Sequence, residues 1–182
     1  MALAVAALKE GQLIILPTET VYGLAADPGA VERIYKAKGR PDDKPIPLLA
    51  ADTATIENSG CDLGRIGRVL AEKFWPGPVT LVLKTPDGFK GFRVPDYPVT
   101  QAVLRLWGRL LAVTSANRSG ESAALRAEEA ANALGPCVAY VLDAGPSPGG
   151  VPSTVAKIDG DRIVILREGA ILKKRIMEAA QA

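Results

Sequence analysis

Runs of Val, Ile and Leu recur along this chain with amphipathic helical patterns between them, and this alternation narrows the folds open to it more than any other feature. It is typical of an α/β domain, in which strands share a sheet and helices pack on that sheet. Strands are expected at residues 13–16, 47–49, 79–83, 110–114, 139–142, 154–158 and 163–166. Helices are expected at residues 3–9, 30–38, 63–74, 99–106, 127–134 and 170–180.

Glycines and one turn refine this fold. Gly11, Gly39 and Gly135 each follow a helical pattern and are expected to end helices, because glycine readily adopts the left-handed conformation found there. Near the C-terminus, the Asp-Gly-Asp at 159–161 separates two apolar runs, which predicts a hairpin and therefore an antiparallel pair. The expected fold class is α/β, with a mixed sheet and helices packed on it.

Size, cysteine usage and the first residues limit the class of protein. The chain has 182 residues, 48% of them hydrophobic, so a single domain over 1–182 with one substantial core is expected. Cys61 and Cys137 form no Cys-x-x-Cys pattern, which predicts neither disulfides nor zinc and favours the reducing cytosol. The opening MALAVAALKEG has no preceding basic region and predicts a short helix rather than a secretory signal. No apolar run reaches the roughly 18 to 20 residues of a membrane span, so a cytoplasmic protein without membrane contact is expected.

The chain contains no histidine, which limits its chemistry. A histidine general base, a Ser-His-Asp triad and a histidine-ligated metal are all excluded. Catalysis must therefore use lysine, arginine, hydroxyl, amide, carboxylate or backbone groups. The 22 Lys and Arg exceed the 20 Asp and Glu by only 2, so a basic site must come from local clustering.

One such cluster lies in IYKAKGRPDDKPIPLL, where four cations fall within nine residues. Lys36 and Lys38 lie in the last turn of a predicted helix, where cations interact favourably with the helix dipole, so a purely structural role is one interpretation. Arg40 and Lys44 follow the helix on a stretch bent by glycine and proline. The four could converge on one polyanion, since guanidinium and ammonium groups match phosphate oxygens. No Walker motif occurs, so a bound nucleotide would be held differently.

A second cluster lies at the end of a predicted strand, in TSANRSGE. Ser115 and Asn117 are two residues apart, so in an extended chain they present a hydroxyl and an amide to the same side. A turn that closes the strand is the alternative interpretation. Ser115 has no histidine partner, which argues against a nucleophilic serine and favours binding.

Three more polar segments end predicted elements, where α/β sheets usually present ligand sites. The turn that contains Thr18 could form a lip over a small ligand or serve only as a turn. Glycines before Ser153 permit close backbone approach to a charged group, with Ser153 donating and Arg167 capping the anion. Arg93 adds a cation just before a proline turn.

Taken in order and spacing, the segments PTETVYGL, KGRP, FWPGP, RVP, TSANRSGE, PSTV and ILREG make the chain resemble the YrdC/TsaC-like family of threonylcarbamoyl-AMP synthases, in its single-domain form. The resemblance implies a nucleotidyltransferase that joins L-threonine, bicarbonate and ATP, releases pyrophosphate, and leaves threonylcarbamoyl adenylate for modification of an adenosine beside the tRNA anticodon. It also implies a twisted, open α/β sheet with a concave basic face. Protein partners in tRNA modification, contact with tRNA, and Mg²⁺ held through the triphosphate without a named protein ligand are further implications of the resemblance.

The resemblance also implies roles for individual residues. Contact with threonine falls to Thr18, Arg93 and Ser153. The residues that the resemblance places in contact with ATP are Lys38, Arg40, Lys44, Ser115, Asn117 and Arg167. It also implies a catalytic role for Lys38 and Arg40. Leu48 and Leu49 stand where some family members carry a histidine, so that part of the threonine pocket is left unassigned.

Two alternative functions compete with threonylcarbamoyl-AMP synthesis. An RNA-binding module of the same fold would use the clustered cations to bind phosphates without turnover. The sequence argues weakly against it, because net charge is low and only nine aromatic residues are present. A paralogue with the same fold would use a different acyl acceptor in place of threonine.

Overall fold

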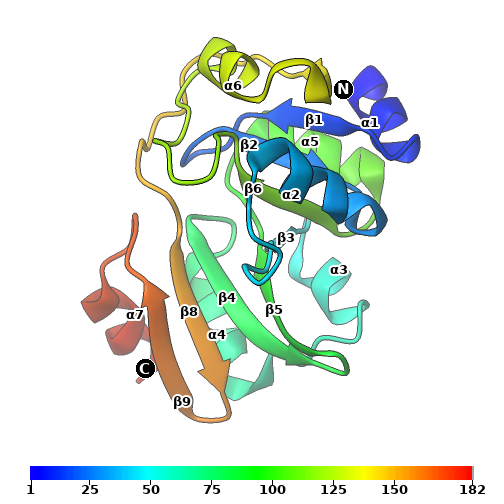
Figure 1. The fold of residues 1–182 in the computed structure, drawn as a ribbon. Coiled ribbons are helices and arrows are strands. Elements are labelled where there is room, and N and C mark those ends of the chain that lie inside the picture. Colours follow the sequence, from blue (N-terminus) through cyan, green and yellow to red (C-terminus); the bar gives the residue numbers. More distant parts are fainter. Residues whose placement is uncertain (182) are drawn as a thin grey trace.

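The computed structural model describes residues 1–181 and contains one mixed sheet with the strand order β7-β1-β2-β6-β3-β5-β4-β8-β9 (Figure 1). The strands are β1 (Leu13–Leu16), β2 (Gly23–Ala26), β3 (Leu48–Leu49), β4 (Val79–Thr85), β5 (Gly88–Arg93), β6 (Leu111–Ser115), β7 (Val138–Val141), β8 (Thr154–Asp159) and β9 (Arg162–Arg167). The α-helices are α1 (Ala2–Lys9), α2 (Val31–Lys38), α3 (Thr53–Glu57), α4 (Gly64–Phe74), α5 (Pro98–Trp107), α6 (Ala127–Leu134) and α7 (Lys173–Ala180). Two short 3-10 helices are η1 (Pro28–Ala30) and η2 (Gly135–Cys137).

The sheet mixes both strand orientations, as predicted. β1 runs parallel to β7, β3 to β5 and β4 to β8, while the other neighbours are antiparallel. The hairpin expected around 159–161 joins β8 to β9. Both predictions, the α/β class and the mixed sheet, are therefore confirmed.

The sheet divides into two halves that meet at the two-residue strand β3. The upper half of Figure 1 consists of β7, β1, β2 and β6, and the lower half of β5, β4, β8 and β9. Leu48 of β3 pairs with Ala112 in β6 on one side and with Phe92 in β5 on the other. Only this short strand continues the backbone pairing from one half to the other.

The upper half is buried on both faces. Ile14 and Leu16 of β1 pack with α1 and α5, whereas Leu13 and Ile15 pack on the opposite face with α2 and α6. All four residues of β1 are buried. A run of four apolar residues is what a strand between two helix layers requires.

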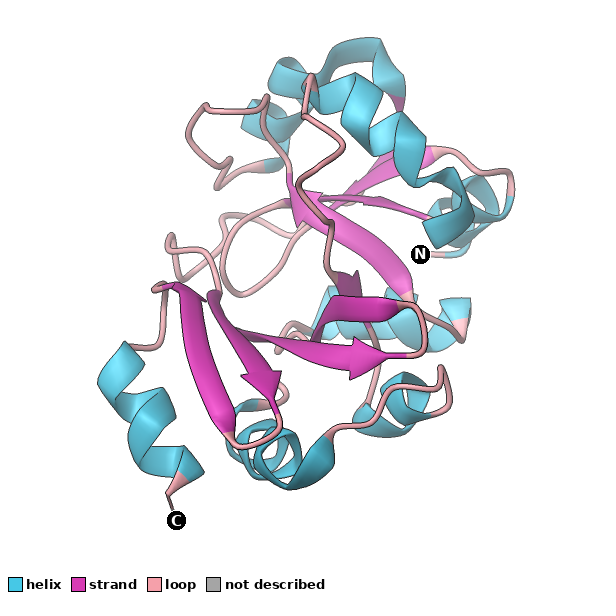
Figure 2. Ribbon diagram, turned by 60° about the horizontal axis from the view of Figure 1, so that its bottom comes forward, coloured by secondary structure: helices cyan, strands magenta, loops and turns pink. Residues whose placement is uncertain are grey.

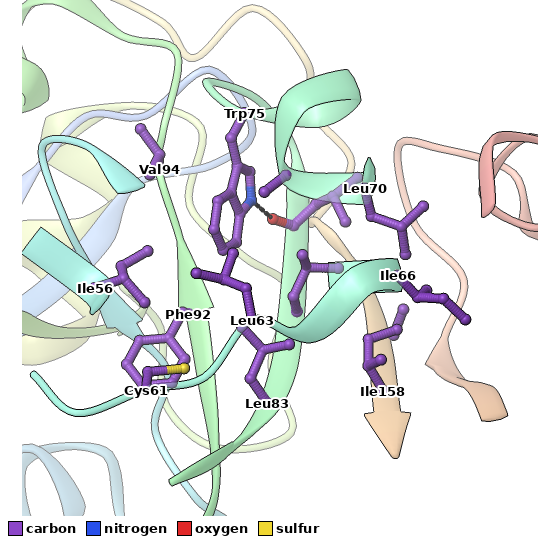
Figure 3. Packing of buried hydrophobic residues seen from close by; sticks show 14 of the residues in the cluster. Ile56, Cys61, Leu63, Ile66, Leu70, Trp75, Leu83, Phe92, Val94 and Ile158 are labelled. Atoms are coloured by element: carbon purple, nitrogen blue, oxygen red, sulfur yellow. Dashed lines mark hydrogen bonds between the residues drawn. The ribbon is translucent and has the colours of Figure 1, made fainter. Parts of the chain in front are cut away.

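The lower half has a hydrophobic core on one face only. Figure 2 shows helices below these strands and loops above them. Leu81, Phe92 and Ala156 point into the core, together with residues of α4 and α7. In Figure 3, Trp75 packs in this cluster, and its Nε1 donates to the Val79 carbonyl over 2.7 Å. The alternate residues of the same strands face away from this core and are available to a ligand.

Besides the 3-10 helices, the structure contains two strands and one α-helix that were not predicted from the sequence. β2 is made of glycine, leucine and alanine and contains no β-branched residue, and β5 contains two glycines and a lysine. Their pairing with neighbouring strands outweighs these weak propensities. Helix α3 has only five residues, too few for a clear period.

Helix ends largely follow the expected glycines. Gly39 and Gly135 directly follow α2 and α6 with φ of 58° and 57°, and Gly11 has φ of 70° just beyond α1. Helix α7 begins three residues later than expected, and the N–H groups of Ala170 and Ile171 ahead of it donate to the Pro152 carbonyl and to Thr154 Oγ1. Within residues 1–181, every helix falls short of the length and apolarity that a bilayer crossing requires.

Candidate functional site

A pocket of about 340 Å³ lies over the uncovered face of the lower half, and its walls come from both halves. The turn between β1 and β2 and the end of β6 supply the upper wall. Thr80 of β4, Phe89 of β5 and Val155 of β8 belong to the uncovered face that forms the floor. The volume is in the range of small-molecule sites.

The pocket is strongly cationic. Arg40, Arg93 and Arg167 are the charged residues in its lining among residues 1–181, and no carboxylate joins them. Burial lowers the pKa of Arg167, and the nearby Arg93 and Arg40 lower it further. Three guanidinium groups that repel one another in a partly buried space favour the binding of an anion.

A β-bulge brings Arg167 into this pocket. Val155 of β8 pairs with Arg167, but the next residue, Ala156, pairs with Ile165, so Leu166 is an extra residue in β9. Without it, alternation would direct Arg167 to the same face as Ile165, toward the core. With it, both Leu166 and Arg167 line the pocket. The guanidinium is held by the Ser153 carbonyl, at 2.8 Å from Nη2 and 3.1 Å from Nε.

Arg40 is held by its own loop. Its Nε donates to the Lys44 carbonyl over 3.2 Å and its Nη2 to the Pro45 carbonyl over 3.3 Å. The Lys44 carbonyl also accepts from the Tyr35 hydroxyl. Lys44 therefore shapes the loop through its backbone, while its side chain is exposed and does not line the pocket.

Lys38 lies beneath the pocket wall, with 4% of the residue exposed. Its Nζ donates to the carbonyls of Ser115 and Asn117, the latter over 2.6 Å, and lies 3.4 Å from Asn117 Oδ1. An ammonium has three N–H groups, so these three acceptors account for all of them. Burial lowers the pKa of Lys38 to about 8, with a further contribution from Arg40. Lys38 thus fastens the end of α2 to the turn after β6.

Asn117 completes that turn and is also buried. Its Nδ2 donates to the carbonyls of Arg118 and Glu121, both over 2.8 Å. The amide is therefore committed to the turn, as the alternative interpretation of this segment expected. Ser115, by contrast, lines the pocket.

The remaining predicted residues take part in two small polar groups of the pocket lining. Ser153 Oγ lies 2.9 Å from Thr80 Oγ1 and accepts from Arg167 Nη2 over 3.2 Å. Thr18 Oγ1 lies 2.8 Å from Thr20 Oγ1, which accepts from Nη1 and Nη2 of Arg93 over 3.2 Å each. The side chains assigned to threonine from the sequence are therefore joined to the arginines.

The structure thus brings most of the predicted site residues to one pocket. Those that line it are Thr18, Arg40, Arg93, Ser115, Ser153 and Arg167. Those outside the lining are Lys38, Lys44 and Asn117. The sequence analysis assigned no role to several other lining residues, among them Thr20, Tyr22, Thr80, Phe89, Gly91 and Leu166. A glycine inside a strand, as at Gly91, is one signal that could have pointed to the floor.

The described residues offer no ready-made metal centre. Within residues 1–181, no three His, Cys, Asp or Glu side chains gather in a way that could hold a metal ion. The pocket presents hydroxyl groups and arginines instead.

Comparison with known proteins identifies the fold family. A family model described as "Telomere recombination", for the Sua5, YciO and YrdC proteins, matches residues 6–169. The chain belongs to the Sua5/YciO/YrdC family. This confirms the family resemblance expected from the sequence motifs.

Individual family members match most of the chain. A threonylcarbamoyl-AMP synthase of Bacillus subtilis is 38% identical over 97% of this chain and 55% of its own length. A putative threonylcarbamoyl-AMP synthase of Mycobacterium tuberculosis is 39% identical over 96% of this chain and 86% of its own length. The solved structure of Pyrococcus abyssi Sua5 complexed with L-threonine superposes with a TM-score of 0.92 at 33% identity, over 97% of this chain and 56% of that one. The chain thus spans about half the length of two of these three relatives.

Proposed function

We propose that this chain is a threonylcarbamoyl-AMP synthase, which makes threonylcarbamoyl adenylate and pyrophosphate from L-threonine, bicarbonate and ATP. The observation that carries the proposal is one pocket lined by three arginines and no carboxylate among the described residues. Relatives that are 38% and 39% identical to the chain over the aligned residues bear this name, the second as putative. Every reactant except the threonine amine carries negative charge, so a cationic pocket suits all of them.

The amino acid is assigned to the wall formed by Thr18, Arg93 and Ser153. This part of the pocket combines one guanidinium with a group of hydroxyls. A carboxylate can pair with the guanidinium, while hydroxyl groups can bind the amine or the side-chain hydroxyl of threonine. The L-threonine complex of a structural neighbour supports a threonine site in this fold.

The nucleotide is assigned to Arg40, Ser115 and Arg167. These groups come from three separate segments and present cations and a hydroxyl to the same space. Lys38 and Asn117 contribute by holding the turn that carries Ser115, and Lys38 also lies next to Arg40. Lys44 contributes through its carbonyl, which orients Arg40.

The chemistry that follows needs no protein nucleophile. The threonine amine attacks the carbon of bicarbonate, a C–O bond of the bicarbonate breaks, and water leaves with a proton of the amine, which gives the carbamate. A carbamate oxygen then attacks the α-phosphorus of ATP, and the bond to pyrophosphate breaks. Arginines that are already fixed by backbone carbonyls can hold the anions together and stabilise the charge on the leaving group. Correct placement of reactants can contribute roughly 7 to 11 kcal/mol toward lowering the barrier.

Several finer expectations belong to the same proposal. Mg²⁺ would enter on the triphosphate, since the pocket lining contains hydroxyls but no carboxylate among residues 1–181. The chain would act as one domain in the cytoplasm and pass its product to protein partners in tRNA modification, with contact to tRNA at that stage.

A substrate-omission assay tests the proposal. Pyrophosphate release should require ATP, threonine and bicarbonate together, and calorimetry should detect threonine binding before ATP is added. Serine and valine in place of threonine would reveal a paralogue with another acceptor. The proposal would be contradicted if pyrophosphate were released equally well without threonine. It would also be contradicted if the chain bound tRNA in a salt-dependent way and showed no turnover.

A further inference from the structure

Glu19 and Arg93 form an ion pair that is shielded from solvent. Their side chains are 14% and 8% exposed, and Glu19 Oε1 lies 2.6 Å from Arg93 Nη2. In each of the other ion pairs within residues 1–181, at least one side chain is more than half exposed. Exposed pairs contribute little to the position of their side chains, whereas a buried carboxylate next to a guanidinium restricts it strongly.

The guanidinium of Arg93 is clamped on several sides. Its Nε donates to the Gly77 carbonyl over 3.1 Å, and Nη1 and Nη2 both donate to Thr20 Oγ1. Nη2 also lies in ionic contact with Glu19 Oε1, at 2.6 Å but without hydrogen-bond geometry. Three of the five N–H groups therefore have hydrogen-bond partners within residues 1–181. Because Nη2 is in ionic contact with Glu19, the second N–H of Nη1 is the one left for a ligand.

The contacts of Thr18, Thr20 and Arg93 determine which hydroxyl donates and which accepts in each hydrogen bond. Thr18 Oγ1 donates its single proton to the Val21 carbonyl over 2.6 Å. In the 2.8 Å contact with Thr20, therefore, Thr20 must be the donor. Thr20 Oγ1 is left free to accept from Arg93, and the polar chain runs from Arg93 through Thr20 and Thr18 to a backbone carbonyl.

Glu19 itself cannot reach a ligand. Both of its carboxylate oxygens are shielded from solvent, and neither receives a geometrically good hydrogen bond within residues 1–181, although Oε1 is in close ionic contact with Arg93. The carboxylate does not line the pocket. Its backbone is fixed, because the Gly149 N–H donates to the Glu19 carbonyl over 2.9 Å. Any effect of Glu19 on the site must therefore pass through Arg93.

The other two arginines of the pocket are held differently. Arg40 and Arg167 are fixed by neutral oxygen atoms of the backbone and of Ser153. Only Arg93, among the three, contacts a carboxylate within residues 1–181. A counter-ion reduces repulsion among the three guanidinium groups, and a charge-assisted contact is roughly twice as strong as a neutral one.

We propose that Glu19 is a positioning residue, which holds the Arg93 guanidinium with one Nη1 N–H directed into the pocket so that it can bind the carboxylate of the amino acid substrate. The claim that Arg93 binds the substrate carboxylate rests on the proposed function. The claim that Glu19 fixes the conformation of Arg93 does not. Glu19 acts as a fixed negative charge behind the binding group.

The test compares Glu19→Gln, which keeps the shape but removes the charge, with Glu19→Ala, which removes the contact. The matched control is Glu57→Gln, which breaks the exposed 2.7 Å pair with Arg68 away from the pocket. NMR of the guanidinium nitrogens, assigned with Arg93→Lys, reports whether Nη1 and Nη2 of Arg93 give separate signals. Calorimetry measures the dissociation constants for threonine and for ATP.

In the wild type and in Glu57→Gln, we expect separate Nη signals for Arg93 and the same threonine affinity. In Glu19→Gln the two Nη signals should average, and threonine should bind roughly tenfold to a hundredfold more weakly, with a much smaller change for ATP. A folded Glu19→Gln with wild-type Nη signals would overturn the positioning role. If the wild type itself failed to bind threonine, the proposed function would be wrong, and the Nη signals would still decide the role of Glu19.

Discussion

The upper half of the sheet is covered by helices on both faces, whereas the lower half is covered on one. In β1 of the upper half, four consecutive apolar residues are buried, while in β4 of the lower half Leu81 points into the core and Thr80 and Val82 line the pocket. The difference shows how this fold makes room for a site on one half of the sheet. It omits one helix layer, and the uncovered strand face carries hydroxyl, cationic and apolar side chains, among them Thr80, Arg93 and Phe89.

The largest effects should come from the buried positions, and a set of alanine substitutions tests the comparison directly. In β1, Ile14→Ala and Ile15→Ala should each lower the free energy of unfolding by about 2 to 5 kcal/mol, because both face a core. In β4, Leu81→Ala should cost a similar amount, but Val82→Ala less than about 1 kcal/mol. Urea denaturation measures all four. Equal losses at Leu81 and Val82 would show that the lower half is covered on both faces.

Removal of a cationic side chain from the pocket should lower activity and leave the stability of the fold nearly unchanged. Arg40→Ala should reduce threonylcarbamoyl adenylate formation by a factor on the order of 10² to 10³, since a fixed charge at the reacting anions is removed. The free energy of unfolding should change by less than about 1 kcal/mol. Pyrophosphate release measures the first effect, and Arg33→Ala, an exposed arginine on α2, serves as the control. Wild-type turnover in Arg40→Ala would contradict the assignment of Arg40.

The two halves are also tied together by the loop before β8. Gly149 and Gly150 donate to the carbonyls of Glu19 and Thr20 in the upper half. In Gly149→Ala, the added Cβ would lie 2.5 Å from the Glu19 carbonyl oxygen, so one of the two segments must move. We expect a loss of about 1 to 3 kcal/mol in the free energy of unfolding. Threonine affinity, measured by calorimetry, should fall as well, and an unchanged affinity would show that the loop is not coupled to the site.

The smallest effect is a dependence on pH that belongs to the upper half. Because burial lowers the pKa of Lys38 to about 8, the folded chain binds fewer protons at this group than the unfolded chain between about pH 8 and the ordinary value of 10.5. The contribution of Lys38 to the free energy of unfolding therefore rises with pH across this window. Denaturation of the wild type and Lys38→Met measures the difference, with Lys36→Met, an exposed lysine of the same helix, as the control.

The same titration should appear in catalysis with the opposite sign. Above about pH 8, neutral Lys38 loses one of the three N–H groups that hold the turn after β6. Turnover should therefore decline as the stability contribution rises. A pH profile without a transition near this value would contradict the role of Lys38 in holding Ser115.

Much of this fold could be predicted from local patterns, because those patterns coincide with strong propensities. The β-branched strand β9, the hairpin at 159–161 and the helix end at Gly39 each have a local cause that is visible in a few residues. β2 and β5 lack such a cause. Their glycine and alanine residues adopt extended structure because β1, β6 and β4 offer unpaired backbone groups beside them.

The site was predictable as a set of motifs but not in its geometry. Family motifs pointed to Arg40, Arg93 and Arg167, and all three line one pocket. The bulge at Leu166, which directs Arg167 into that pocket, has no local signal in an apolar run. Nor could the spacing show that Lys38 is occupied by backbone carbonyls, because these acceptors lie 77 and 79 residues further along the chain.

The missing helix layer has a thermodynamic consequence for the lower half. A substrate bound on β4, β5 and β8 would cover the strand face that no helix covers. The ligand would then take the place of the second helix layer. Ligand binding and the folding of these strands are then linked, and saturating substrate should slow amide exchange in β5 and β9 far more than in β1 or β2. In this enzyme family, the molecule being transformed would also be part of the scaffold that holds it.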